Sequence, residues 1–430
     1  MGLAAGARVE EAAGEDQLAF VRTTMGVEKI SFDRLTPSQP PVVVLGDLTL
    51  IRTIAAADVP IVLATSEADD IALHSRYLSG SRVVSAFVEQ PGLDRCAEEL
   101  VDLGTRLTRH LGRKVPLFYN SDKHLEVIYR HRKALSDVYL MLLNDEEVAW
   151  ALHDKSRFGP MCEKAGVRVP KTLQSSEDIE RGLDQLREPV LVKPKQKNSW
   201  IEIKRHLFDG QGKARVFATK RELLAHPAFA RFKDEVIVQE YIGGSVASLV
   251  SFHGIADEKG QLLASYCGRK IRTYPDFAGE SCFIELLHDP KVDAEGRDIA
   301  KRLGLKGPFK VDLILDERSG DLYTLEINAR FNLWNQLGAA NGINFCGLAY
   351  DYLVHGRRPL QEPSYSDRYR WVNFYRDYLT FKDQRRRGEL GLRSWLGSLS
   401  GPHVLHETFK WDDPVPFALW VGNFIKHKFV

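Results

Sequence analysis

The stretch Leu322–Arg330, LYTLEINAR, places an acid, an amide and a guanidinium at every second position. Successive side chains of a β-strand point to opposite faces, so we expect Glu326, Asn328 and Arg330 on one face and the apolar residues between them on the other. One face of the strand would then carry oxygen ligands and end in a cation.

The segment just upstream, KVDLILDERSGD, predicts a second strand and a polar turn that closes a hairpin. With the turn centred near Ser319, Asp312 lies opposite Glu326, and the Asn328 amide joins the two carboxylates. Like charges so close repel each other unless a cation lies between them. Oxygen ligands without Cys or His favour Mg²⁺ or Mn²⁺ over zinc, with phosphate oxygens completing the shell. The alternative left open is a hairpin whose polar face meets only water.

Two lysines are candidates for phosphate contacts. Lys155 lies in LHDKSRF, and Lys193 follows the apolar strand PVLV and precedes a proline. A lysine fixed at the end of a buried strand is well placed to reach a phosphate group. The ordinary alternative for each is a solvated side chain.

A third element, VIVQEYIGG, reads as a strand that is apolar at first, becomes polar at Gln239 and Glu240, and breaks at Gly243. A strand that leaves its sheet exposes backbone N–H and C=O groups, which can bind the edge of a purine. By itself the segment is equally typical of a plain sheet edge and turn.

Composition narrows the class of protein. The 59 basic and 58 acidic residues nearly cancel, so no overall field favours nucleic acid or an anionic membrane. Five cysteines without framework or CxxC spacing fit a reducing compartment. The acidic N-terminus does not resemble a signal peptide, and no apolar run approaches the ~18 residues that span a bilayer. We expect a cytoplasmic protein without nucleic-acid partners or membrane insertion.

The order of elements predicts several domains. PVVVLGDLTL, a helix and PIVLATS predict a βαβ unit with a parallel sheet, and Ser121 and Asp122 at its carboxyl edge are typical of a helix N-cap. No GxGxxG fingerprint supports an oxidoreductase. From VRVPKT onward, strands separated by polar loops indicate α+β architecture. The Lys/Gly-rich interval 194–235 is expected to form a flap.

In this order, DKSRF, VLVKPK, VQEYIGG, VDLIL and EINAR resemble the motifs of the ATP-grasp superfamily over about residues 41–355. The phrases HSRY, GRKIRTYP and EINARFNLWNQLGAANGI are most similar to carboxylate–amine ligases of the D-aspartate ligase type. The resemblance implies an α/β and α+β chain with an ATP-grasp fold and a Rossmann-like pre-ATP-grasp domain. We expect an arm at 1–40, the Rossmann-like domain at 41–145, a lid with its linker helix at 146–242, a catalytic subdomain at 243–360 and an aromatic-rich extension at 361–430.

The resemblance also implies roles for matching residues. Those expected to bind ATP are Lys155 and Lys193 at the α- and β-phosphates, and Gln239, Glu240 and Ile242 at adenine. Those expected to hold two Mg²⁺ ions are Asp312, Glu326 and Asn328. Arg330 would stabilise charge on the phosphoryl group or on the tetrahedral intermediate. Arg269 and Arg272 of GRKIRTYP are further catalytic candidates; whether that run bulges decides which face each occupies, and Arg269 is preferred.

The implied reaction converts a carboxylate into an acyl phosphate with ATP, after which an amine, from an amino acid or peptide, expels phosphate. An ATP-grasp kinase and a non-catalytic nucleotide-binding module remain alternatives, and a homodimer is left open. KQKNSWIEIKRHLFDGQGKAR replaces the compact phosphate loop of many relatives, so the backbone amides that hold phosphate are not identified. The aromatic tail beyond residue 360 either packs on the catalytic domain or docks a large or anionic acceptor, such as a carrier or a cell-wall precursor.

Overall fold

The structure is a computed structural model, and it describes residues 28–86, 92–195, 200–208, 214–244, 246–277, 279–401 and 403–429. The chain divides into two compact units. The first comprises Met1–Met141, Leu353–Gly356 and Phe409–Val430, and the second comprises Leu142–Tyr352 and Arg357–Thr408. None of the described helices is long and apolar enough to cross a membrane.

The first unit contains a six-stranded sheet of order β1-β4-β3-β2-β5-β6. Its strands are β1 (Glu28–Ile30), β2 (Val42–Leu45), β3 (Ile61–Thr65), β4 (Leu78–Val83), β5 (Val115–Tyr119) and β6 (Tyr139–Leu140). All neighbours pair in parallel except β1, which pairs antiparallel with β4. The helices of this unit are α2 (Leu48–Ala55), α3 (Gly92–Leu111), α4 (Asp122–Arg130), α5 (Arg132–Val138) and α17 (Val415–Phe429), with 3₁₀ turns η1 (Phe32–Arg34) and η2 (Ile71–His74).

Two helices of the first unit begin at residues whose side chains cap the helix N-terminus. The Asp47 carboxylate accepts hydrogen bonds from the backbone N–H groups of Thr49 and Leu50 at the start of α2, and the Ser121 hydroxyl accepts one from His124 at the start of α4. Both caps follow the carboxyl ends of neighbouring strands, β2 and β5, where the strand order reverses. The side chain of Ser121 is therefore used as a helix cap.

The second unit contains a four-stranded antiparallel sheet of order β7-β10-β8-β9. Its strands are β7 (Thr172–Leu173), β8 (Val190–Pro194), β9 (Arg215–Phe217) and β10 (Val236–Glu240). The accompanying helices are α8 (Ser176–Gly182), α9 (Trp200–His206), α10 (Lys220–Ala225) and α11 (Phe229–Phe232), with turns η3 (Leu183–Gln185) and η4 (Lys233–Glu235). They share one core, which contains Val190, Phe217 and Leu223. The interval 194–235, expected to be a flap, thus contains ordered elements around this core, although 196–199 and 209–213 lie outside the described residues.

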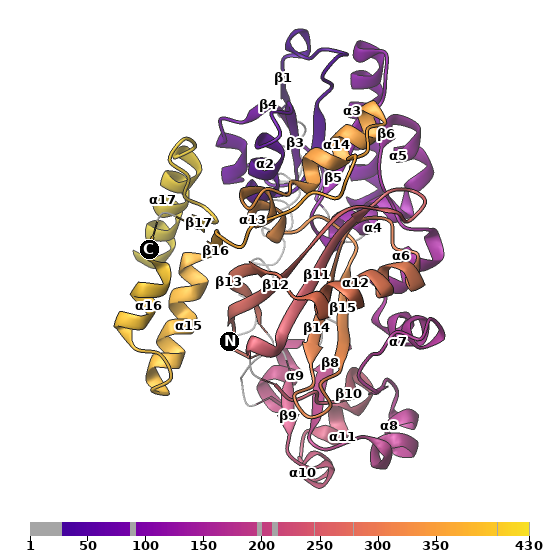
Figure 1. Ribbon diagram of the computed structural model, residues 1–430, viewed down its shortest axis with the longest axis vertical. Helices are drawn as coiled ribbons and strands as arrows, with labels where there is room; N and C mark the ends of the chain where they lie inside the picture. The colour runs from indigo at the N-terminus through magenta and orange to yellow at the C-terminus, as the bar shows by residue number, and fades with distance from the viewer. Residues whose placement is uncertain are drawn as a thin grey trace, which may run out of the picture. The chain divides into compact units, whose positions relative to one another are not determined.

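The larger sheet of the second unit has seven strands in the order β15-β14-β11-β12-β13-β16-β17 (Figure 1). These strands are β11 (Leu249–Ala256), β12 (Leu262–Tyr274), β13 (Glu280–Leu287), β14 (Gly307–Leu315), β15 (Leu322–Asn328), β16 (Arg370–Val372) and β17 (Val404–His406). The helices that accompany them are α6 (Glu146–His153), α7 (Lys155–Lys164), α12 (Pro290–Leu303), α13 (Trp334–Ala340), α14 (Phe345–His355), α15 (Phe374–Arg386) and α16 (Leu392–Leu399), with turn η5 (Val246–Ser248).

One face of the seven-stranded sheet is covered by α12. Val292, Ile299 and Leu303 of this helix join a core with Phe252 and Val311 of the strands. Apolar residues therefore occupy alternate positions of β11 and β14, and the positions between them are left for polar side chains on the opposite face.

Candidate active site

The hairpin β14–β15 brings the predicted carboxylates together. Asp312 pairs with Glu326, and Lys310 pairs with Asn328. The register shifts by one residue after Asp312, so Leu313 faces Thr324 and Leu325 is the extra residue of a bulge. The predicted pairing of Asp312 with Glu326 is confirmed, but the expected apolar face ends at the bulge.

Asp312 is the buried member of this pair. Its side chain is 12% exposed, and its Oδ1 atom has no hydrogen-bond partner among the described residues. Burial alone would raise the pKa of Asp312, but the neighbouring Lys270 and Lys310 ammonium groups outweigh it and hold the pKa below its usual value. A buried carboxylate oxygen without a donor is available to a cation.

Two lysines beside Asp312 were missed by sequence reasoning. Lys310 Nζ lies 2.8 Å from Asp312 Oδ2, and Lys270 Nζ lies 3.7 Å from Oδ1. The spacing could have identified Lys310, because it precedes Asp312 by two positions on one strand and must share its face. Burial, the largest cause, lowers the pKa of Lys310 despite the opposing attraction of Asp312. Lys270 lies on β12, and the strand order of the sheet, β14-β11-β12, is what brings it close to Asp312.

The polar residues at the end of β15 and just after it lie in the same group as Asp312. Asn328 Nδ2 lies 3.5 Å from Asp312 Oδ2, and the Arg330 guanidinium donates to Asn328 Oδ1 at 3.1 Å. Glu326 is exposed, whereas Asn328 and Arg330 are half-buried. The structure therefore assembles an acid pair, an amide and three cations on one face.

The predicted nucleotide residues gather in the four-stranded sheet. The Lys193 ammonium donates to Gln239 Oε1 at 3.0 Å, and Gln239 Nε2 donates to the Thr172 hydroxyl at 2.7 Å. Glu240 accepts a hydrogen bond from the Arg187 backbone N–H at 3.2 Å. Ile242 is 4% exposed, just beyond the end of β10. Lys193, Gln239 and Glu240 thus lie on neighbouring strands.

Arg187 links this nucleotide group to the hairpin. Its guanidinium lies 3.8 Å from Glu240 Oε1 and 3.4 Å from Asp316 Oδ2, in the turn that follows β14. Lys155 is the first residue of α7, and its side chain lies outside the described residues. The predicted role of Lys155 consequently stays a prediction.

The two arginines of GRKIRTYP have other partners. The register of β12 shifts on both sides of Arg272, because Lys270 faces Ile284 and Arg272 faces Phe283. Arg269 pairs with Glu285 at 2.5 Å and is half-exposed. Among the described residues, the carboxylate partners of both arginines lie away from the hairpin, so a catalytic part for either one stays a prediction.

Arg272 is locked in a buried network. Its Nε and Nη2 atoms donate to Asp377 at 2.6 and 3.1 Å, and Nη2 also donates to the Ser398 hydroxyl at 3.0 Å. The guanidinium lies 4.5 Å from the centre of the Phe283 ring. These contacts fasten α15 and α16 to β12, which is a structural role.

The donor set at the hairpin fits a hard divalent cation. Asp312 and Glu326 supply carboxylate oxygens, Asn328 an amide oxygen, and Asp312 Oδ1 is buried without a donor in the described part of the chain. The described residues contain no group of three or more His, Cys, Asp and Glu that could hold a metal by themselves. A metal bound here would therefore need ligands from a substrate such as a triphosphate.

Comparison with known proteins identifies the domain. Residues 152–332 match the model of a family described as an ATP-grasp domain. The D-aspartate ligase of Enterococcus faecium (strain Aus0004) is 24% identical over 288 residues, which cover 64% of this chain and 68% of that ligase. A D-alanine–D-alanine ligase of Rickettsia massiliae (strain Mtu5) is 25% identical over 210 residues, or 46% of this chain and 60% of that ligase.

A solved structure shares the fold. The N5-carboxyaminoimidazole synthetase of Staphylococcus aureus complexed with ADP has a TM-score of 0.54 at 14% identity, and the match covers 76% of this chain and 79% of that one. These comparisons confirm three predictions: the ATP-grasp family, the mixed α/β fold, and the class of ATP-dependent ligase that forms C–N bonds. Residues 152–332 therefore carry an ATP-grasp domain, and the chain is similar to the D-aspartate ligase over 64% of its length.

Proposed function

We propose that this chain is an ATP-dependent ligase that activates a carboxylate as an acyl phosphate and joins it to an amine. The observation that carries the proposal is the pairing of Asp312 with Glu326 across the hairpin, beside the ammonium groups of Lys270 and Lys310. Two acids and a row of cations on one sheet face are suited to a polyphosphate that arrives with a divalent metal.

The metal-binding residues in this proposal are Asp312, Glu326 and Asn328. Mg²⁺ or Mn²⁺ held there would neutralise charge on the phosphates of ATP. Lys310 and Lys270 would hold the phosphate oxygens from the protein side, where burial strengthens a charge-assisted hydrogen bond. The nearby Arg330 would face the reacting group.

The nucleotide end of ATP would lie on the smaller sheet. Lys193 is held at the end of β8 by Gln239, so its ammonium group is aimed before any phosphate arrives. Glu240 forms the last pair of β10 and Ile242 lies just beyond it, so Gln239, Glu240 and the backbone at Ile242 would bind the adenine. Lys155 would contact the phosphates from the start of α7.

The chemistry then has two steps. A carboxylate oxygen of the substrate attacks the γ-phosphorus of ATP, the bond to the bridging oxygen breaks, and ADP leaves. The amine nitrogen next attacks the acyl carbon, the C–O bond to phosphate breaks, and the amine loses a proton as inorganic phosphate departs. In the second step Arg330 would stabilise the oxyanion of the tetrahedral intermediate, because a fixed donor is most effective where charge develops.

An amino acid or a short peptide is the substrate class we propose for at least one partner. The support is the similarity to a D-aspartate ligase and to D-alanine–D-alanine ligases, which are both named for an amino acid substrate.

Phosphate release from ATP, screened against pairs of amino acids and carboxylates, tests the proposal when the products are weighed by mass spectrometry. We expect ADP, free phosphate and a product lighter by one water than the two substrates together. Glu326→Ala should abolish turnover while circular dichroism stays unchanged. A product that retains phosphate would identify a kinase, and full turnover by Glu326→Ala would refute the assignment of the hairpin.

A further inference from the structure

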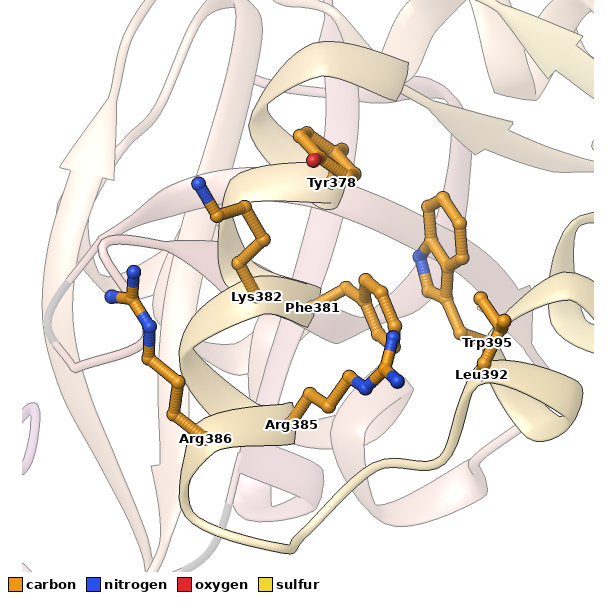
Figure 2. A pocket seen from close by; sticks show the side chains of 7 residues that line it. All are labelled: Tyr378, Phe381, Lys382, Arg385, Arg386, Leu392 and Trp395. Atoms are coloured by element: carbon orange, nitrogen blue, oxygen red, sulfur yellow. The ribbon is translucent and has the colours of Figure 1, made fainter.

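Helices α15 and α16 of the second unit form an open groove that the proposed reaction does not use. It encloses about 490 Å³. Figure 2 shows the residues that line it, which are Tyr378, Phe381, Lys382, Arg385, Arg386, Leu392 and Trp395. None of them is among the residues proposed to bind ATP or metal.

The floor of the groove is aromatic. The Phe381 ring stacks on the Trp395 indole at a centroid distance of 4.4 Å, and the Tyr378 ring lies 6.1 Å from the same indole (Figure 2). Apolar exposure continues beyond the groove, because Phe374 is 51% exposed and Leu396 is 52% exposed. Contiguous exposed aromatic and aliphatic side chains are typical of a surface that binds another protein.

Positive charge borders this floor. Lys382 lies over the Tyr378 ring at 5.8 Å and Arg385 over the Phe381 ring at 5.8 Å, and neither has a carboxylate within 4.0 Å in the described part of the chain. In contrast, Arg387 nearby is held by Asp276 and Glu389. Arg386 of the groove is likewise paired, with Asp383 at 3.4 Å, so Lys382 and Arg385 are the two groove cations left for an external acid among the described residues.

The helix pair is a rigid platform. Asp377 binds both Arg272 of β12 and the Trp395 indole N–H, the latter at 2.7 Å, so one buried carboxylate fixes both helices to the sheet. The Thr380 hydroxyl donates to the Thr273 carbonyl at 2.7 Å. A surface that is held in place before binding loses little entropy when a partner docks.

The shape and charge together select the kind of partner. Phe374, Tyr378 and Arg385 recur along one side of α15 over about 16 Å, at ~1.5 Å per residue. This length suits three turns of a helix, whereas a small anion would contact only one rim. We propose that the groove docks an acidic amphipathic helix of a partner protein, with its apolar side on the exposed Tyr378 and Leu392 and its carboxylates on Lys382 and Arg385.

The test uses the full chain and a fluorescein-labelled 14-residue helical peptide that has Leu on one side and Glu on the other. A matched peptide carries Lys in place of each Glu. Binding is measured by fluorescence anisotropy. We expect saturable binding of the Glu peptide only, and a decrease in its affinity with salt, because the attraction is between exposed charges.

Charge reversal locates the site. Lys382→Glu/Arg385→Glu should weaken binding of the Glu peptide about tenfold or more, because two attractions become repulsions. Arg109→Glu/Lys123→Glu makes the same charge change on exposed positions of α3 and α4 and should alter affinity less than about twofold. Circular dichroism checks that both variants are folded.

Three results would overturn the proposal. Equal binding of the Glu and Lys peptides would show that charge does not select the partner. Undiminished binding of the Glu peptide by Lys382→Glu/Arg385→Glu would show that the peptide binds elsewhere. Saturable binding of inorganic pyrophosphate that displaces the peptide and is lost in Lys382→Glu/Arg385→Glu would identify a small-anion site instead. Self-association of the chain that this variant abolishes would identify a second copy as the occupant.

Discussion

Arg272→Ala separates a structural role for this arginine from a catalytic one. In the folded chain the Asp377 side chain is fully buried and that of Arg272 is 7% exposed. Removing the guanidinium leaves a buried carboxylate whose remaining strong donor, among the described residues, is the Trp395 indole N–H. Loss of one partner of a buried ion pair costs about 3–5 kcal/mol.

We expect the free energy of unfolding to fall by about 3 kcal/mol, the lower end of that range, because the Trp395 donor remains. Urea denaturation monitored by fluorescence measures the change. Arg269→Ala is the matched control: Arg269 is half-exposed, and its partner Glu285 retains Arg370 at 2.9 Å. Its cost should stay below about 1 kcal/mol.

The double variant Arg272→Met/Asp377→Leu should recover much of the lost stability, since it removes both charges. A loss below about 1 kcal/mol in Arg272→Ala would refute the buried-pair reasoning. A fully folded Arg272→Ala protein without turnover would instead assign Arg272 to the reaction.

Further changes test other parts of the structure. Lys193→Met should raise the KM for ATP about tenfold, whereas Lys195→Met should leave it nearly unchanged; equal KM values would remove Lys193 from the nucleotide site. Burial would raise the pKa of Glu362, but hydrogen bonds from Arg297 at 2.8 Å and Ser265 at 2.7 Å outweigh it and lower this pKa. The stability that Glu362 contributes is therefore complete above its ordinary pKa and is lost as pH falls through the folded pKa. Glu362→Gln should flatten this acid limb of an unfolding-free-energy profile, and an unchanged limb would contradict the pairing. Gly296→Ala should destabilise the protein by about 1–3 kcal/mol despite the better helix propensity of Ala, because its Cβ would collide with the Phe252 ring; a rise in the thermal midpoint would contradict this packing.

The hairpin was predictable because its information is local. A polar turn closes the hairpin, and the two-residue period assigns the face of each side chain beyond the bulge. The register beside the turn pairs Leu315 with Leu322 and by itself would place Leu325 opposite Asp312, so the observed pairing of Asp312 with Glu326 also depends on the bulge. Lys310 follows the same period and could have been identified with it. The bulge at Leu325 was not predictable, since nothing in the turn specifies an extra residue there.

Long-range partners lie beyond such reasoning. Lys270 on β12 reaches across β11 to Asp312 on β14, because β12 and β14 are the two neighbours of β11 in the sheet. Local sequence does not specify this strand order. Arg272 meets Asp377 across 105 residues of sequence. In the first unit, Arg52 is paired with Asp413 in the segment before α17, 361 residues later. The proposed extension at 361–430 therefore supplies residues to both compact units.

Anomalous diffraction from crystals grown with Mn²⁺ and a non-hydrolysable ATP analogue tests the central claim most directly. We predict Mn²⁺ bound at about 2.0–2.2 Å by oxygens of Asp312 and Glu326, with the remaining ligands from the triphosphate. Nucleotide bound with Mn²⁺ elsewhere, or with these carboxylates turned away from it, would contradict the account.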